Sequence, residues 1–285
     1  MPNLRAIWDN RFFDAATLAA SSQAAGLPVI NVQDRLRKRV WRTTSLAGQY
    51  LVADLGGSGL EQRPPVTALV LINHNLTPDG EVTIESGDLM ETHPAWADIL
   101  GYGDLGYGGP GGYGGVFNAE ERSFYVPDPL RIIYLNNEGG PLEARGEWQI
   151  SFVDPANPDG YIEVGRIFLT YFDEYRYNFF PDSIGGEDDS EQVLSRGGQV
   201  WTDIMPVRRT LSLPFENLHD ADKFWTLLFM VKKVGLSQDW VIDPVPDGVA
   251  RRHFMALYGR FSEIPEVSRQ FGLHSEFELN FIESL

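Results

Sequence analysis

Short apolar runs separated by turn residues recur through the N-terminal part of the chain. The runs are Tyr50–Leu55, Val66–Ile72, Glu81–Ile84, Phe124–Val126, Leu130–Leu135, Glu147–Val153 and Tyr161–Tyr171. The segment Asp154–Gly160 lies between the last two, and its Pro-Asp-Gly ending is a turn signal, because proline fixes φ and glycine accepts a positive φ. We therefore expect a hairpin there. Several short strands with turns at such intervals predict a β-sandwich or jelly roll.

One amphipathic helix stands out among further strands in the C-terminal part. Apolar residues recur there at i, i+3 and i+4 spacing, namely Leu218, Ala221, Phe224, Trp225, Leu228 and Val231. Two aspartates lie near the start and two lysines near the end, which suits the helix dipole, and Gly235 follows as a stop. The pattern predicts that Trp225 lies on the buried face. Strands are expected at Arg208–Phe215, Trp240–Ile242, His253–Tyr258 and Phe277–Phe281.

An acidic, glycine-containing stretch at 181–196 separates these two patterns. We predict a mainly β protein with a jelly-roll β-sandwich at 1–180, a linker at 181–196 and a smaller α+β domain with one main helix at 197–285. The linker contains Asp182, Asp188, Asp189 and Glu191. These carboxylates leave a calcium site open, but they lack the spacing of an EF-hand, and a solvated linker is the favoured interpretation.

The composition excludes several classes of protein. The chain has no cysteine, which rules out disulfides, Cys-type zinc sites, iron–sulfur clusters and thiol catalysis. A formal net charge of −17 repels phosphate backbones and anionic lipids, so we expect no nucleic-acid partner. No apolar run approaches the roughly 20 residues that span a bilayer, and the N-terminus lacks a signal-peptide pattern. We expect a soluble protein made in a cytoplasm, without membrane insertion.

The sequence contains none of the catalytic or cofactor-binding motifs that we considered. It has no Gly-x-Ser-x-Gly elbow, no His-Glu-x-x-His helix and no Gly-x-x-x-x-Gly-Lys loop. The five histidines, which lack metal-ligand spacing, are His74, His93, His219, His253 and His274. A glycosidase-type carboxylate pair stays open among 40 acidic residues, but their abundance gives it no specific support. We predict that the protein is not an enzyme and has no cofactor or metal site.

Five of the 23 basic residues fall within eight positions of this acidic chain. They are Arg35, Arg37, Lys38, Arg39 and Arg42. One interpretation is a solvated loop whose charges pair with nearby acids. The other is a contact patch that docks the acidic face of a neighbouring subunit, where charge fixes register and orientation.

The segment Gly101–Gly115 holds nine glycines and three tyrosines. It is too rich in glycine to form a core and is expected to be a long loop. One interpretation is a solvated insertion. The other is an adaptable contact or sugar-binding surface, since tyrosine offers contact area at low entropic cost. The candidate residues for that surface are Trp96, Tyr102, Tyr107 and Tyr113.

Five segments between Ala15 and Gly87 follow one another in a recognisable order. They are Thr17–Ser22, Val29–Asp34, Val40–Thr43, Leu51–Gly56 and Val66–Thr77. An Ala-Ser-Ser strand, an Asn-x-x-Asp turn, a Trp-x-Thr segment and an Asp-Leu-Gly strand in this order resemble galactose-binding-like jelly rolls of the discoidin type. The tryptophan of such domains is a core residue, so the resemblance implies that Trp41 is buried.

A longer match begins with the segment Trp148–Leu169, which contains an aspartate, a turn and then Gly-Tyr-Ile-Glu-x-Gly-Arg. Together with Ser195–Gln199 and Arg208–Leu213, it resembles tail-tip and baseplate proteins of tailed bacteriophages. In those proteins the jelly roll is joined to a second domain of the tail-tube or distal-tail type.

The phage resemblance implies a non-enzymatic structural component of the virion tail, assembled in the host cytoplasm. Such a protein would form a homo-oligomeric ring and connect the tail tube to hub or fibre proteins. A head-to-tail ring needs two different faces, and the basic residues from Arg35 to Arg42 would suit one of them. The alternative function is recognition of host-surface carbohydrate by the jelly roll.

Overall fold

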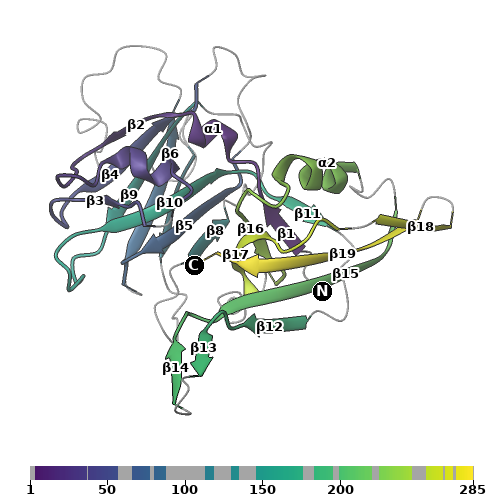
Figure 1. The fold of residues 1–285 in the computed structure, drawn as a ribbon. Coiled ribbons are helices and arrows are strands. Elements are labelled where there is room, and N and C mark those ends of the chain that lie inside the picture. The colour runs from purple at the N-terminus through teal and green to yellow at the C-terminus, as the bar shows by residue number, and fades with distance from the viewer. Residues whose placement is uncertain are drawn as a thin grey trace. The chain divides into compact units, whose positions relative to one another are not determined.

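The computed structural model describes residues 4–36, 38–56, 66–77, 80–87, 113–118, 130–134, 146–175, 183–194, 199–219, 225–245, 255–265, 267–271 and 274–284. The chain divides into two compact units (Figure 1). Residues Asp9–Phe172 form the jelly-roll unit, and Met1–Trp8 with Asp173–Leu285 form the terminal unit.

The jelly-roll unit is a sandwich of two antiparallel sheets, as expected. One sheet has the order β3 (Trp41–Arg42), β10 (Glu163–Thr170), β5 (Ala68–His74), β8 (Leu130–Tyr134). The other has the order β2 (Thr17–Ala20), β4 (Gln49–Asp54), β9 (Glu147–Val153), β6 (Glu81–Gly87), β7 (Tyr113–Asn118). A single-turn helix, α1 (Arg11–Asp14), and a 3₁₀ helix, η1 (Val29–Gln33), precede most of the strands.

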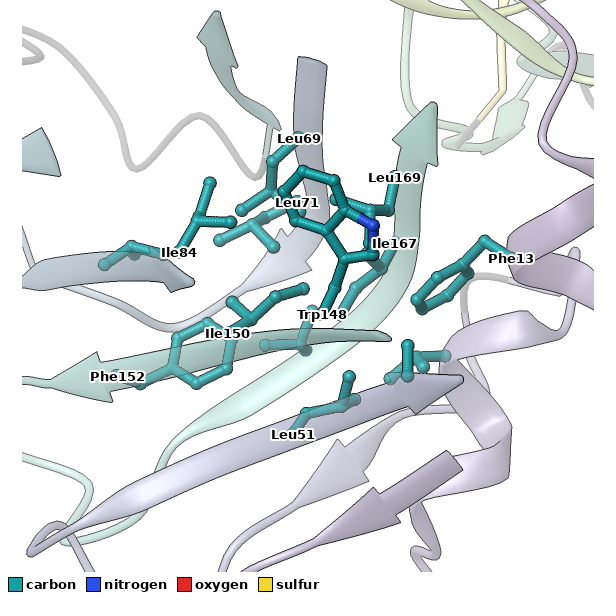
Figure 2. Close-up of a cluster of buried hydrophobic side chains, with 14 of the residues drawn as sticks. Phe13, Leu51, Leu69, Leu71, Ile84, Trp148, Ile150, Phe152, Ile167 and Leu169 are labelled. Carbon is teal, nitrogen blue, oxygen red and sulfur yellow. The ribbon is translucent and has the colours of Figure 1, made fainter. Parts of the chain in front are cut away.

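The core of this unit lies between the two sheets. Figure 2 shows Leu51, Ile150 and Phe152 from one sheet and a second group from the other sheet, namely Leu69, Leu71, Ile167 and Leu169. Successive side chains alternate between faces, so residues two apart in a strand reach the same core. Trp41 is fully buried, packs against Phe152 at 5.8 Å and donates its indole N–H to the Ser22 carbonyl at 2.9 Å. The expected core role of Trp41 is confirmed.

The turn at Asp154–Gly160 is not a hairpin, contrary to our expectation. Strand β9 pairs with β4 and β6, whereas β10 pairs with β3 and β5. The turn therefore carries the chain from one sheet to the other. The turn chemistry is correct, with Gly160 at φ +76°, but turn chemistry alone does not say which strands pair.

The terminal unit is built on an eight-stranded antiparallel sheet. Its order is β11 (Asp173–Tyr175), β1 (Leu4–Ile7), β16 (Trp240–Asp243), β17 (Leu257–Phe261), β19 (His274–Glu283), β15 (Arg208–His219), β12 (Ser183–Glu187), with β18 (Val267–Phe271) also paired to β19. Helix α2 (Trp225–Val234) packs on the core of the sheet through Leu227, Met230 and Val234. The unit is of the expected α+β type.

Three details of the terminal unit differ from the sequence-based expectations. Trp225 is 61% exposed, so the buried face of α2 is not the predicted one, and Leu218 belongs to β15 rather than to the helix. The N-terminal strand β1 belongs to this unit, because it pairs with β11 and β16. The expected linker at 181–196 contributes two strands, β12 and β13 (Glu191–Leu194).

Candidate functional site

Two turns of the jelly-roll unit are bound together by buried polar side chains. Asp154 is 1% exposed, and its carboxylate accepts hydrogen bonds from the Thr77 N–H and hydroxyl, both at 2.7 Å. Asn157 donates to Asp154 at 3.2 Å and to the Asn75 carbonyl at 2.9 Å. A side chain at Gly80 would bring its Cβ to 3.0 Å from the Asp154 carboxylate. These bonds fix the turn after β5 against the turn after β9.

Asn75 connects these two turns to a segment nearer the surface. Its side-chain carbonyl accepts the Glu163 N–H at 2.7 Å, and its amide N–H₂ donates to the Tyr161 carbonyl at 3.0 Å and to Asp159 at 2.9 Å. All of its amide functions are therefore directed at the segment 159–163. Because Asn75 holds this segment, the backbone that carries its side chains has a fixed position.

Arg42, Tyr161 and Glu163 form the exposed end of this network. The Arg42 guanidinium lies 4.2 Å from the centre of the Tyr161 ring, and its Nε donates to Glu163 Oε2 at 2.7 Å. The Arg42 and Glu163 side chains are 35% and 22% exposed. The hydrogen bond that Arg42 donates to Glu163 raises the pKa of Arg42 above its ordinary value. We call Arg42, Asn75, Asp159, Tyr161 and Glu163 the loop cluster.

The loop cluster has the chemistry of a site for a polar ligand with many hydroxyl groups. Arg42 offers donors in a planar fork, and the carboxylates of Asp159 and Glu163 offer acceptors. Tyr161 adds an aromatic surface with a polar tip. Pairs of planar donors and acceptors beside an aromatic ring are what neighbouring sugar hydroxyls require.

His74 is the titratable group next to the loop cluster in sequence. Its Nδ1 accepts the Leu76 N–H at 3.2 Å, which leaves the proton on Nε2. Nε2 is shielded from solvent and finds no hydrogen-bond partner in the described part of the chain, although the residue as a whole is half-buried. Burial, with a smaller contribution from the Arg131 charge, lowers the pKa of His74 to about 3. His74 is therefore neutral at physiological pH.

The structure divides the predicted basic cluster. Arg35, Lys38 and Arg39 are exposed on the segment after η1, and Arg39 pairs with Asp34 at 2.7 Å. Arg42 is held in the loop cluster by Glu163 instead. Arg37 lies outside the described residues. The pairing interpretation thus holds for Arg39 and Arg42, and a contact role of the patch stays a prediction.

Most of the predicted Gly/Tyr surface falls outside the described residues, including Trp96, Tyr102 and Tyr107. The backbone of Tyr113 lies in β7, opposite Ser86 of β6. The end of the glycine-rich segment is thus part of a strand and not of a loop. The sugar-binding role proposed for these aromatic residues stays a prediction.

Sequence reasoning missed Asn75, Asp159, Tyr161 and Glu163 as a site. The signal was present, since three of them lie in or directly after the turn that carries the phage resemblance. The residues of that segment support the phage resemblance, and no binding surface was predicted from them. In the described part of the chain no group of three or more His, Asp or Glu side chains is placed to hold a metal ion. No helix there has the length and apolar character needed to cross a bilayer.

The sequence matches no family model and no curated protein. Solved structures similar to this chain include a mutant lectin binding domain of lectinolysin complexed with Lewis b, with a TM-score of 0.38 and 10% identity, covering 58% of this chain and 99% of that one. A Streptococcus pneumoniae fucose binding module has a TM-score of 0.36 and 10% identity, covering 57% and 98%.

The family 32 carbohydrate-binding module of NanJ from C. perfringens, in complex with galactose, has a TM-score of 0.35 and 13% identity, covering 59% and 99%. All three of these structures are carbohydrate-binding modules. Similarity at this level assigns neither a ligand nor a function to this chain.

Proposed function

We propose that the protein is a non-enzymatic recognition protein whose jelly-roll unit binds carbohydrate at the loop cluster. The observation that carries this proposal is the position of the Arg42 guanidinium over the Tyr161 ring, where a hydrogen bond to Glu163 holds Arg42. It joins an aromatic surface, a planar donor and two acceptors on a backbone that Asn75 and Asp154 hold fixed. Preorganised polar groups bind hydroxyls at a lower entropic cost than mobile ones.

The loop cluster favours sugars with adjacent hydroxyl groups. No hydrogen bond from Arg42 Nη1 is found among the described residues, so this nitrogen can donate to a ligand. Asp159 is exposed, and Asn75 donates to its Oδ2, while no hydrogen bond to its Oδ1 is found in the described part of the chain. A vicinal diol would accept from Arg42 through one oxygen and donate to a carboxylate through the other.

A glycan-binding screen followed by titration calorimetry tests this function. We expect saturable binding of at least one glycan, and a loss of about tenfold or more in affinity on Tyr161→Ala or Glu163→Gln, since one bound hydrogen bond or ring contact contributes about 1–2 kcal/mol. Tyr50→Ala is the matched control, because Tyr50 is a half-buried tyrosine on β4, in the sheet that does not contain Arg42 and Glu163. Binding that survives both cluster variants, or no binding in the screen, would refute the proposal.

The second candidate is the structural role in a bacteriophage tail tip or baseplate that the sequence resemblance implies. The observation that favours it is the hairpin of β13 and β14 (Val200–Asp203), which exposes Trp201, Leu194 and Val193 by 61–70%. Large apolar patches on a soluble protein mark contacts with other proteins. In this role the protein would form a ring in the virion tail, assembled in the host cytoplasm, and contact tube, hub or fibre proteins. Light scattering combined with negative-stain microscopy would detect the ring.

A further inference from the structure

A two-stranded hairpin extends from one edge of the terminal sheet. It begins where Glu187 of β12 pairs with Arg208 of β15, and we call its described residues, 188–194 and 199–207, the arm (Figure 1). Among the described residues, strands β13 and β14 pair with each other and with no other strand. At the base, Arg208 contacts Asp189 at 2.5 Å. The arm is therefore attached to the terminal sheet at its base, and its outer part is a two-stranded sheet by itself.

The arm exposes more apolar surface than a solvated linker would. The exposed apolar side chains are Val193, Leu194, Val200, Trp201, Ile204, Met205 and Val207, with exposures of 44–81%. A lone two-stranded hairpin is at best marginally stable in water. These side chains have no core to join within the arm, so burial against another surface is what would stabilise it.

The strand register gives one face of the arm a defined chemistry. Val193 lies opposite Trp201, and Glu191 lies opposite Asp203, so these four side chains share one face. Two carboxylates directly opposite each other repel and destabilise the pair of strands. A cationic partner would remove that repulsion. This face thus requires a surface that is both apolar and basic.

The jelly-roll unit carries such a surface between Ile30 and Arg39. Ile30 and Leu36 are 55% and 60% exposed, and Arg35 and Lys38 are exposed on the same segment. No ion pair of Arg35 or Lys38 is found among the described residues, whereas Arg39 is matched by Asp34. We call the four side chains of Ile30, Arg35, Leu36 and Lys38 the apolar–basic patch. It is an unusual surface in a chain with a net charge of −17.

We propose that the arm of one copy docks on the apolar–basic patch of a second copy, so that the protein assembles head to tail. Trp201 and Val193 would cover Ile30 and Leu36, while Glu191 and Asp203 would meet Arg35 and Lys38. Each copy keeps a free arm and a free patch after one contact, and such contacts between different faces form rings or filaments. The inference does not depend on sugar binding.

The size of the two surfaces determines how strong the contact is, and their charge determines how it depends on salt. A stable interface uses about 20–30 residues on each side, whereas the apolar–basic patch consists of four side chains. A single contact is therefore weak, and closure of a ring, which links several contacts, makes the assembly stable. Because charges steer and orient the contact, association weakens as ionic strength rises.

Sedimentation of the full chain at micromolar concentrations tests the proposal. We expect the wild type to self-associate. The variant Glu191→Lys/Asp203→Lys and the variant Arg35→Glu/Lys38→Glu should each weaken association by about tenfold or more, since each reverses two interfacial charges. A mixture of the two variants should associate with each other, because the reversed arm again faces a patch of opposite charge.

The control matched to Arg35→Glu/Lys38→Glu is Lys232→Glu/Arg260→Glu, which makes the same change in net charge at exposed residues of the terminal unit. It should leave association unchanged. Self-association that survives both charge reversals, or reversed variants that fail to associate with each other, would overturn the arm–patch contact while leaving a ring with another interface possible. A wild type that stays monomeric in low salt would overturn self-assembly as well. Calorimetry with glycans is a separate readout that none of these variants should change.

Discussion

Acidification should destabilise the jelly-roll unit through one histidine. His74 has a pKa of about 3 in the folded protein, against about 6.5 in an unfolded chain. A lowered pKa means that the folded state binds fewer protons than the unfolded state between these two values. Stability from the neutral His74 is therefore fully present above pH 6.5 and is lost as the pH falls toward 3. The perturbation to apply is His74→Leu, which removes the titrating group.

The size of the effect follows from the two pKa values. Lowering the pH from about 7 to about 5 protonates His74 almost completely in the unfolded chain and hardly at all in the folded one, which costs about 2 kcal/mol. The residue is half-buried as a whole, and solvent screening reduces the cost, so we expect a loss of about 1–2 kcal/mol. Carboxylates also titrate in this range. The relevant quantity is therefore the difference between wild type and variant.

Urea denaturation at both pH values measures this difference. The wild type should lose about 1–2 kcal/mol more than His74→Leu between about pH 7 and pH 5. The variant also loses the acceptor of the Leu76 N–H, but that loss is present at both pH values and cancels. Parallel pH profiles for the two proteins, or an NMR titration of His74 near its ordinary pKa, would refute the buried, neutral state of this imidazole.

Two further predictions concern the terminal unit. Gly259→Ala should destabilise it by about 3 kcal/mol or more, or prevent its folding, because the added Cβ would lie 2.0 Å from the Ile282 carbonyl oxygen. A thermal midpoint equal to that of the wild type would contradict this close approach. Trp225→Ala should change stability by no more than about 1 kcal/mol, whereas Leu227→Ala should cost about 2–5 kcal/mol, since Trp225 is 61% exposed and Leu227 is 2% exposed. If Trp225→Ala were the more destabilising variant in chemical denaturation, the buried face of α2 would be the one expected from the sequence.

The sequence predicted most strands because their patterns are local. Tyr50–Leu55, Val66–Ile72 and Glu147–Val153 each lie within about two residues of an observed strand, since apolar runs bounded by turns have few other conformations open to them. Pairing is not local. The turn at Asp154–Gly160 has all the residues of a hairpin turn, yet its two strands belong to different sheets. Which strands pair depends on the positions of β4, β5 and β6, whose edges β9 and β10 join.

The helix α2 shows a second limit of local patterns. Apolar residues at Trp225, Leu228 and Val231 define one possible face, and Leu227, Met230 and Val234 define another. Both have helical spacing, so periodicity alone cannot choose between them. Packing on the sheet decides between them, because Leu227, Met230 and Val234 join the buried cluster that the strands of the terminal unit form. Trp225 and Phe229 are left exposed as a result.

The arm explains why an acidic, polar stretch can be both exposed and ordered. Linkers and hairpin arms share a composition, since neither buries a core, and the sequence of 181–196 fits both. What separates them is pairing at a distance: Ser183–Glu187 pairs with β15, and Glu191 pairs with Asp203 across the arm. Those bonds fix the direction of Trp201 and Val193, which a flexible linker would not do. Trp201 and Val193 therefore lie on a defined face of the arm, and the proposed contact pairs the two carboxylates of that face with Arg35 and Lys38.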